Sequence, residues 1–151
     1  MADAQAGDKF ITVRLAAQAD FTDDTLTQFT GWSFDGLAGR AYEIEVNLIY
    51  FLTTASDGFQ ISLSGSATFT DVRLSVEFLD WPSKAHVLLG QITAKDAPQG
   101  TNASDIANVW LRGSVLVNAA GTVTIKGACN QNTTGTCSVV AGSTFKYRLA
   151  Q

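Results

Sequence analysis

The sequence predicts an all-β protein, an antiparallel two-sheet sandwich of jelly-roll type with about eight strands. Thirteen Gly, many Thr, Ser and Val, and only two Pro are typical of a sandwich or barrel. The sequence contains no long run of Leu, Glu and Lys at helical spacing, which would have favoured helices. Several segments alternate apolar and polar residues with a period of two, which is the pattern of a strand with one buried face.

The strongest strand is expected at Ala41–Leu52. Its even-numbered residues from Tyr42 to Leu52 are all apolar, whereas the opposite face begins with Glu43 and Glu45. Other strands are expected at Phe10–Leu15, Phe59–Leu63, Val72–Phe78, Val109–Val117, around Val123 and Ile125, and in a closing strand at Phe145–Leu149. The pattern weakens at His86–Thr93. The segment Asp20–Thr30 is interpreted as loop or edge, and Ala94–Ser104 as a loop.

The chain of 151 residues, 46% of them hydrophobic, is long enough for one domain that buries its own core. Residues 1–9 are small and polar and predict a short flexible N-terminal arm, so the single jelly-roll domain is expected at residues 10–151. The longest apolar stretch is far shorter than the roughly 20 residues that cross a bilayer, so no membrane partner is expected. No secretory signal is recognised, which favours synthesis in a cytosol.

Charge is divided unevenly along the chain. All fourteen Asp and Glu lie in residues 1–105, whereas the remainder carries only the cations Arg112, Lys126, Lys146 and Arg148. Four scattered cations beside an acidic remainder are a weak nucleic-acid footprint, so nucleic acid is not expected as a partner. The alternative is that the late strands lie beside the early acidic ones, either within one sheet or across a subunit contact.

Two cysteines, Cys129 and Cys137, flank the polar loop NQNTTGT. A structural zinc site needs four ligands, and two Cys with one His do not supply them. A disulfide could close this loop if the strands on either side pair. A cytosol would keep the thiols reduced, whereas a particle released from the cell could oxidise them.

The sequence contains no recognisable catalytic constellation. The lone His86 is expected to be structural, and the serines of LSGS lack the G-x-S-x-G pattern. Asp23 and Asp24 match no calcium loop, and Glu43 and Glu45 share one strand face instead of facing each other across a cleft. We therefore expect no enzyme activity, no metal and no cofactor.

Two blocks of the chain resemble small virion proteins of tailed bacteriophages. They are AGRAYEIEVNLIYFLTTASDGFQISLSG, from Ala38 to Gly65, and GTVTIKGACNQNTTGTCSVVAGSTFKYRL, from Gly121 to Leu149. With the connecting strands the likeness covers most of the chain from about Phe10, and Cys129 and Cys137 depart from it. The resemblance implies a capsid decoration (cement) protein, a head fibre or a receptor-binding tip, commonly a trimer of jelly rolls similar to the tumour-necrosis-factor fold.

This resemblance also implies which strands share a sheet. The closing strand would lie beside Ala41–Leu52, in a sheet that also contains Val109–Val117. The face of that sheet turned away from the core would then hold Glu43, Glu45, Ile49, Phe51, Trp110, Arg112, Leu116, Lys146 and Arg148. A surface that is too apolar for free solvent and too charged for a core predicts a threefold contact. The alternative is that these residues pack beneath loops of one subunit.

The leading hypothesis is a homotrimeric decoration protein that binds the major capsid protein on the outside of a phage head. Its expected location is the capsid surface of the virion, after synthesis in the cytoplasm of the host bacterium. A chain of 151 residues without a fibrous shaft suits this role better than that of a complete tail fibre. The alternative is a receptor-binding or adhesion module in which Trp32, Trp81 or the loop Asn130–Thr136 contacts a host-surface glycan or protein. A small stacking platform of Trp110 and Arg112 for a sugar is a further alternative to packing at a subunit contact.

Overall fold

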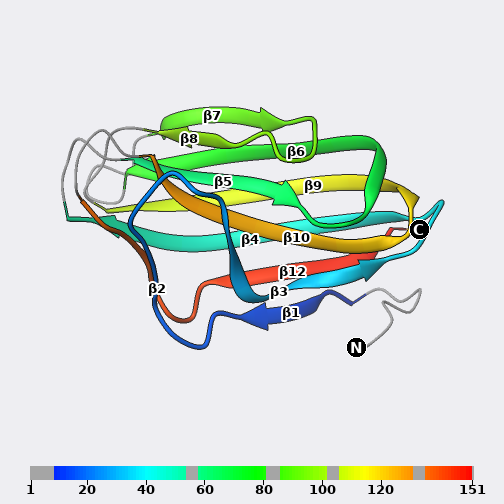
Figure 1. The fold of residues 1–151 in the computed structure, drawn as a ribbon, viewed down its shortest axis with the longest axis horizontal. Helices are drawn as coiled ribbons and strands as arrows, with labels where there is room; N and C mark the ends of the chain where they lie inside the picture. Colours follow the sequence, from blue (N-terminus) through cyan, green and yellow to red (C-terminus); the bar gives the residue numbers. More distant parts are fainter. Residues whose placement is uncertain (1–8, 54–57, 81–85, 102–105, 131–134, 151) are drawn as a thin grey trace.

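The computed structural model describes residues 9–53, 58–80, 86–101, 106–130 and 135–150. These residues form twelve β-strands and no helix, in two antiparallel sheets packed face to face (Figure 1). The strands are β1 (Ile11–Arg14), β2 (Ala19–Phe21), β3 (Thr27–Gly36), β4 (Ala41–Leu52), β5 (Gly58–Ser64), β6 (Thr68–Asp80), β7 (His86–Ile92), β8 (Gln99–Thr101), β9 (Ile106–Ala119), β10 (Gly121–Asn130), β11 (Cys137–Val139) and β12 (Thr144–Leu149). The predicted all-β two-sheet sandwich is confirmed, although the structure has twelve strands where about eight were expected.

The larger sheet has eight strands with β4 at its centre. Its main order is β1, β12, β4, β9, β6 and β7, and the short strands β11 and β2 extend it because β11 pairs with both β4 and β2. The smaller sheet has the order β3, β10, β5 and β8. The closing strand β12 therefore lies on one side of β4 and β9 on the other, which is the arrangement that the resemblance implied.

The core lies between the two sheets and is rich in aromatic rings. Every even-numbered residue of β4, from Tyr42 to Leu52, is at most 8% exposed. From the opposite sheet, the Trp32 ring stacks on Phe145 of β12 at 6.0 Å and the Phe34 ring on Tyr147 of β12 at 4.3 Å, both between ring centroids. Each large apolar side chain contributes about 1.5–3 kcal/mol when fully buried, so these rings are a main source of cohesion between the sheets.

The strand β3 is the largest departure from the sequence prediction. That prediction placed loop or edge at Asp20–Thr30, followed by a segment in which glycines flank Trp32 and Phe34. The inward residues Phe29, Trp32 and Phe34 are separated by three and then two positions, so they do not alternate. Gly31 between them has a φ of 78°, which glycine adopts without steric cost. The register of β3 against β10 shifts at this point. A bulge therefore turns Trp32 inward and hides the period of two.

Three other short or weak segments also form strands. β2 begins just before the segment expected to be loop or edge, and β8 lies inside the expected loop Ala94–Ser104, where it pairs with β5. β7 forms where the alternation was weakest and pairs with β6. Of the predicted N-terminal arm, only Lys9 lies within the described residues.

Cys129 and Cys137 are joined by a disulfide with their Cα atoms 5.4 Å apart. The strands that carry them, β10 and β11, do not pair with each other. The disulfide therefore forms without the strand pairing that was expected to bring the two cysteines together. β10 belongs to the four-stranded sheet, whereas β11 is paired with β2 and β4 of the eight-stranded sheet. The bond therefore links the two sheets.

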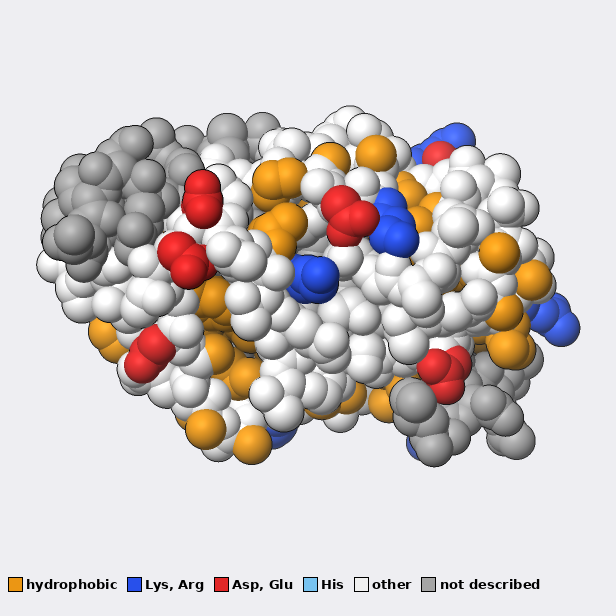
Figure 2. Space-filling view, in the orientation of Figure 1, with side chains coloured by type: hydrophobic (Ala, Val, Ile, Leu, Met, Phe, Trp, Pro, Cys, Tyr) orange, Lys and Arg blue, Asp and Glu red, His pale blue; other side chains and the backbone are white. Residues whose placement is uncertain are grey.

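The outer face of the four-stranded sheet is polar. Figure 2, in which this sheet is turned toward the viewer, shows mostly backbone and uncharged polar side chains in white, with scattered hydrophobic side chains and isolated charged ones. Among the described residues the large exposed hydrophobic side chains are Leu37, Ile49 and Trp110, and none of them lies in this sheet. The remaining outer face, on the eight-stranded sheet, is therefore the place to look for an interaction site.

Candidate functional site

The outer face of β12, β4 and β9 collects all nine residues that were singled out for a subunit contact. Antiparallel pairing places Glu43 opposite Arg148, Glu45 opposite both Lys146 and Arg112, and Ala41 opposite Leu116. Asn47 lies opposite Trp110, Ile49 opposite Asn108, and Phe51 opposite Ile106. We call this surface the Trp110 face. Its use as a contact between copies stays a prediction.

The charged residues of the Trp110 face pair within the same chain. Both Nε and Nη2 of Arg148 lie 2.6 Å from a carboxylate oxygen of Glu43, so the guanidinium donates to it from two nitrogens. Nζ of Lys146 lies 3.7 Å from Glu45, and Nη2 of Arg112 lies 3.9 Å from Glu77 on β6. Three of the four cations that follow residue 105 are thus placed against acids of earlier strands, which accounts for most of the charge asymmetry.

Such half-exposed ion pairs stabilise the fold by only about 0–1 kcal/mol each. These ion pairs matter more for recognition than for stability, because each cation already has a carboxylate nearby. A partner that approached this face would therefore meet few charges in need of a counter-ion.

Two large apolar side chains stand among these ion pairs. Ile49 and Trp110 are each 39% exposed, and they are diagonal neighbours because Ile49 lies opposite Asn108, two residues before Trp110. Phe51 and Leu116 on the same face are partly buried. Leu37, which is 52% exposed, lies outside the face in the turn between β3 and β4. The apolar part of the Trp110 face is therefore a local patch and not scattered exposure.

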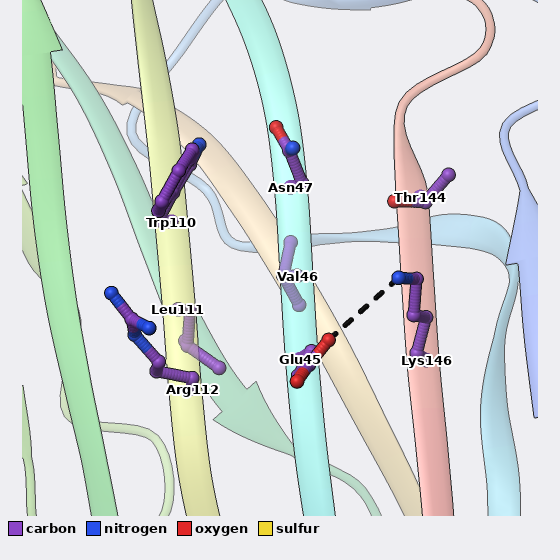
Figure 3. A pocket seen from close by; sticks show the side chains of 8 residues that line it. All are labelled: Glu45, Val46, Asn47, Trp110, Leu111, Arg112, Thr144 and Lys146. Atoms are coloured by element: carbon purple, nitrogen blue, oxygen red, sulfur yellow. Dashed lines mark ion pairs between the residues drawn. The ribbon is translucent and has the colours of Figure 1, made fainter. Parts of the chain in front are cut away.

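A shallow groove of about 230 Å³ runs beside this patch (Figure 3). Trp110 forms one wall, Asn47 points toward it from β4, and Lys146 with its partner Glu45 forms the opposite side. The guanidinium carbon of Arg112 lies 5.7 Å from the Trp110 ring centroid, within the range of a cation–π contact. An exposed indole beside amide, ammonium and carboxylate groups can stack on a planar or sugar ring and hydrogen-bond its polar groups.

A second hollow of about 340 Å³ adjoins the groove across Glu45 and Arg112. Phe10 lies along it, and the guanidinium carbon of Arg148 is 4.6 Å from the Phe10 ring centroid. Sequence reasoning did not include Phe10, Asn47 or Thr144 in the site. The alternation of β4 and β12 could have indicated the last two, since they share the face of Glu45 and Lys146.

The other candidate residues do not assemble into a reactive site. In the described part of the chain, no three His, Cys, Asp or Glu side chains are grouped so that they could hold a metal ion. The Asp23 carboxylate accepts a hydrogen bond from the Thr25 backbone at 2.9 Å. Trp32 is fully buried, so the structure contradicts its suggested role as a ligand contact. Trp81, the side chain of His86 and most of the loop Asn130–Thr136 lie outside the described residues.

The edge of the Trp110 face near β11 holds one carboxylate with an altered pKa. The Ser138 hydroxyl donates to Asp20 at 2.6 Å and the Gln18 amide at 2.7 Å, and these bonds lower the pKa of Asp20 from its ordinary value. Ser138 lies opposite Phe51 in the pairing of β11 with β4. Asp20 is therefore ionised at neutral pH, and its carboxylate already accepts two hydrogen bonds.

Among the described residues, no helix is long and apolar enough to cross a membrane.

No protein-family model and no curated protein matches the chain. Among solved structures it is similar to the T13 particle of infectious bursal disease virus, with 8% identity and a TM-score of 0.43, over 93% of this chain and 35% of that one. It is also similar to a family two carbohydrate esterase from Cellvibrio japonicus, with 9% identity, a TM-score of 0.29, and coverage of 95% and 36%.

A third similar structure is a CBM4 protein, with 14% identity and a TM-score of 0.21, over 89% of this chain and 95% of that one. The chain spans about a third of the length of the viral and esterase chains. At these identities and TM-scores none of the three indicates what this chain binds or does.

Proposed function

We propose that this chain is a structural virion protein without enzyme activity, which forms a homotrimer and decorates the outside of a tailed-bacteriophage capsid. The observation that carries the proposal is the Trp110 face. Ile49 and Trp110 are 39% exposed there, although the neighbouring acids and cations are paired within the chain. Such a face is suited to cover by another apolar surface.

Two further copies of the chain are the partners that we assign to the Trp110 face. Removing apolar surface from water contributes about 25 cal/mol per Å², so covering Ile49 and Trp110 favours association. Closed symmetric oligomers use the same patch in every protomer, and three sandwiches around one axis would turn β12, β4 and β9 inward. The number three comes from the resemblance to trimeric jelly rolls.

The capsid partner rests on the resemblance of Ala38–Gly65 and Gly121–Leu149 to small virion proteins. We assign the contact to the major capsid protein, at a junction between its subunits, through the arm of residues 1–9 and the base of the sandwich. The chain would be made in the cytoplasm of the host bacterium and end on the capsid surface of the virion.

The test uses undecorated heads of the phage that encodes the chain. The purified protein is mixed with these heads and the mixture is sedimented, and we expect the chain to pellet with the heads and to saturate. A map of the decorated particle should then show threefold density outside the capsid shell. Failure to co-sediment at micromolar protein, or density at the tail only, would contradict the decoration role.

A second candidate function is favoured by the groove beside Trp110. The exposed indole and the polar side chains of Asn47, Glu45 and Lys146 have the chemistry of a site for a sugar ring. In that case the chain is a receptor-binding or adhesion module for a host-surface glycan, and the groove must stay open to solvent.

Binding to purified host polysaccharide separates the two candidates. A glycan module should bind it, and Trp110→Ala should lower the affinity by about tenfold or more, as loss of a stacked aromatic does. A decoration protein whose Trp110 face is covered by other copies should show no such binding. Leu37→Ala is the matched control, because it removes an exposed apolar side chain away from the groove.

A further inference from the structure

The disulfide between Cys129 and Cys137 lies where the two sheets meet at one end of the sandwich. Cys129 pairs with Phe59 in the four-stranded sheet. Cys137 pairs with Phe21 of β2 and Leu52 of β4 in the eight-stranded sheet. The disulfide thus joins the two sheets covalently and does not link neighbouring strands of one sheet.

The part that this bond secures is a small ribbon of two strands. β2 and β11 have three residues each, and β2 pairs only with β11. Toward the four-stranded sheet, the segment after β2 accepts one backbone hydrogen bond, from Cys129 N–H to the Asp23 carbonyl at 3.0 Å. The ring of Phe21 also packs edge-on against Phe29 and Phe59, at 5.3 and 5.8 Å between centroids.

Short strands with few partners open at a lower free energy than the long central strands of a sheet. With free thiols, this ribbon would be held to the four-stranded sheet by the contacts of Phe21, by the Asp23 carbonyl and by Cys137, whose Sγ lies 3.0 Å from the Gly58 carbonyl oxygen of β5. With the bond formed, it can leave that sheet only if the whole end of the sandwich opens. The redox state of one bond therefore decides how firmly this end is closed.

Burial of both cysteines makes the oxidised state the more persistent of the two. Cys129 and Cys137 are each 0% exposed, so neither a reductant nor an oxidant reaches the sulfurs in the closed fold. Exchange must await local opening of the ribbon, and the closed disulfide opposes that opening. Formation is accordingly expected to be easier than reduction once the chain has folded.

We propose that the Cys129–Cys137 pair is a redox-controlled lock on the β2–β11 end of the sandwich, open in a reducing cytosol and closed after exposure to a small-molecule disulfide. One protein thiolate attacks the small disulfide, which releases one small thiol and leaves a mixed disulfide. The second protein thiolate then displaces the other small thiol. The protein pair loses two electrons and two protons, and the small disulfide gains them.

The inference rests on the proposed function only for when the chain meets each condition. A virion protein made in a host cytosol and later released would pass from the first to the second. The bond and its effect on the fold are properties of the chain alone. Failure of capsid binding and failure of the lock are therefore separate results.

The experiment uses the full chain purified under a reductant and divided in two. One half is treated with glutathione disulfide and the other is kept reduced, and free thiols are counted after denaturation. We expect none in the oxidised half, two per chain in the reduced half, and a melting temperature about 5–10 °C higher after oxidation. Equal melting temperatures, or thiols that stay free with glutathione disulfide, would overturn the lock.

The double variant C129A/C137A is the control for the two redox treatments, which should melt it at one temperature. If it does not fold, the wild-type chain provides a second readout from the rate of reduction by dithiothreitol. Reduction of the folded oxidised chain should be at least about tenfold slower than in denaturant. Equal rates would show that the closed fold does not protect the bond and would contradict the lock.

Discussion

The two outer faces of the sandwich differ in which side chains they leave exposed to solvent. On the four-stranded sheet, polar groups are satisfied by nearby polar groups: the Ser64 hydroxyl donates to Asp96, and Thr122 exchanges hydrogen bonds of 2.9 to 3.1 Å with Ser66. On the eight-stranded sheet, ion pairs surround Ile49 and Trp110, whose side chains remain 39% exposed.

An antiparallel sheet with one face in water normally carries polar side chains on that face. The four-stranded sheet follows this rule, and the Trp110 face departs from it at Ile49 and Trp110. The charged side chains of the Trp110 face form ion pairs within the chain. The part of this face that a partner would cover is therefore the apolar surface of Ile49 and Trp110. The difference teaches that one sheet is adapted to solvent and the other, on our proposal, to contact with copies of itself.

The strongest way to break this comparison is to place a charge on the apolar patch. Ile49→Asp would bring three carboxylates into the proposed contact without partners, which costs several kcal/mol. We expect the assembly to dissociate at micromolar concentration, as measured by light scattering. Leu37→Asp changes the more exposed leucine in the β3–β4 turn and should leave the mass unchanged. An Ile49→Asp chain that stays assembled would contradict our assignment.

The two tryptophans of the described strands sharpen the contrast between core and face. Trp32 in β3 is 0% exposed and Trp110 in β9 is 39% exposed. Trp32→Ala should lower the free energy of unfolding by about 3–5 kcal/mol, because it leaves a cavity among packed rings. Urea unfolding of dissociated chains should show a much smaller loss for Trp110→Ala. Equal losses would mean that Trp110 serves the fold of one subunit.

Truncation of the aromatic anchors should weaken the assembly without unfolding the chain. We expect Trp110→Ala or Phe51→Ala to reduce the free energy of trimerisation by about 1–4 kcal/mol. Dissociation constants from sedimentation velocity would measure this. Leu37→Ala serves as the control and should lie within the experimental error of the unmodified chain. An effect of Leu37→Ala as large as that of Trp110→Ala would point to nonspecific apolar association.

Salt should have a small effect on the assembly, because the ion pairs of the Trp110 face lie within one chain. Between about 0.05 and 0.5 M sodium chloride, we expect the trimerisation constant to change by less than about threefold. A contact held by charges across subunits would weaken steeply over this range. Sedimentation at several salt concentrations distinguishes the two cases.

The smallest effect concerns Asp20, beside the edge of the Trp110 face. Hydrogen bonds from Ser138 and Gln18 lower its pKa in the folded chain, so their contribution is present above pH 4 and is lost as pH falls through the folded pKa. Ser138→Ala should raise the pKa of Asp20 toward its ordinary value, as followed by NMR titration of the carboxyl carbon. An unchanged titration would show that Ser138 does not hold Asp20.

The sequence predicted elements well where the period of two was unbroken. Ala41–Leu52 has the predicted bounds, and every residue assigned to its inner face is buried, because a strand between two layers separates its faces cleanly. The nine residues of the proposed contact came from the same alternation together with an expected strand order, and the registers place them on one surface.

The sequence failed where the backbone departs from that period. The bulge at Gly31 hid β3, and the three residues of β8 are too few to show any alternation. The link between the sheets was also missed, because the neighbours of Cys129 and Cys137 in the chain say nothing about which sheet each strand joins. Ion-pair partners such as Glu77 for Arg112 depend on register, which alternation alone does not specify.

The mass of the unmodified chain in solution tests the central claim most directly. Sedimentation equilibrium over a range of micromolar concentrations should give a species of about three times the chain mass of 16.0 kDa. A trimer that falls to single chains with Ile49→Asp, and not with Leu37→Asp, is the result that our account predicts. A stable species of one chain mass at every concentration would contradict the assignment of the Trp110 face to contact between copies.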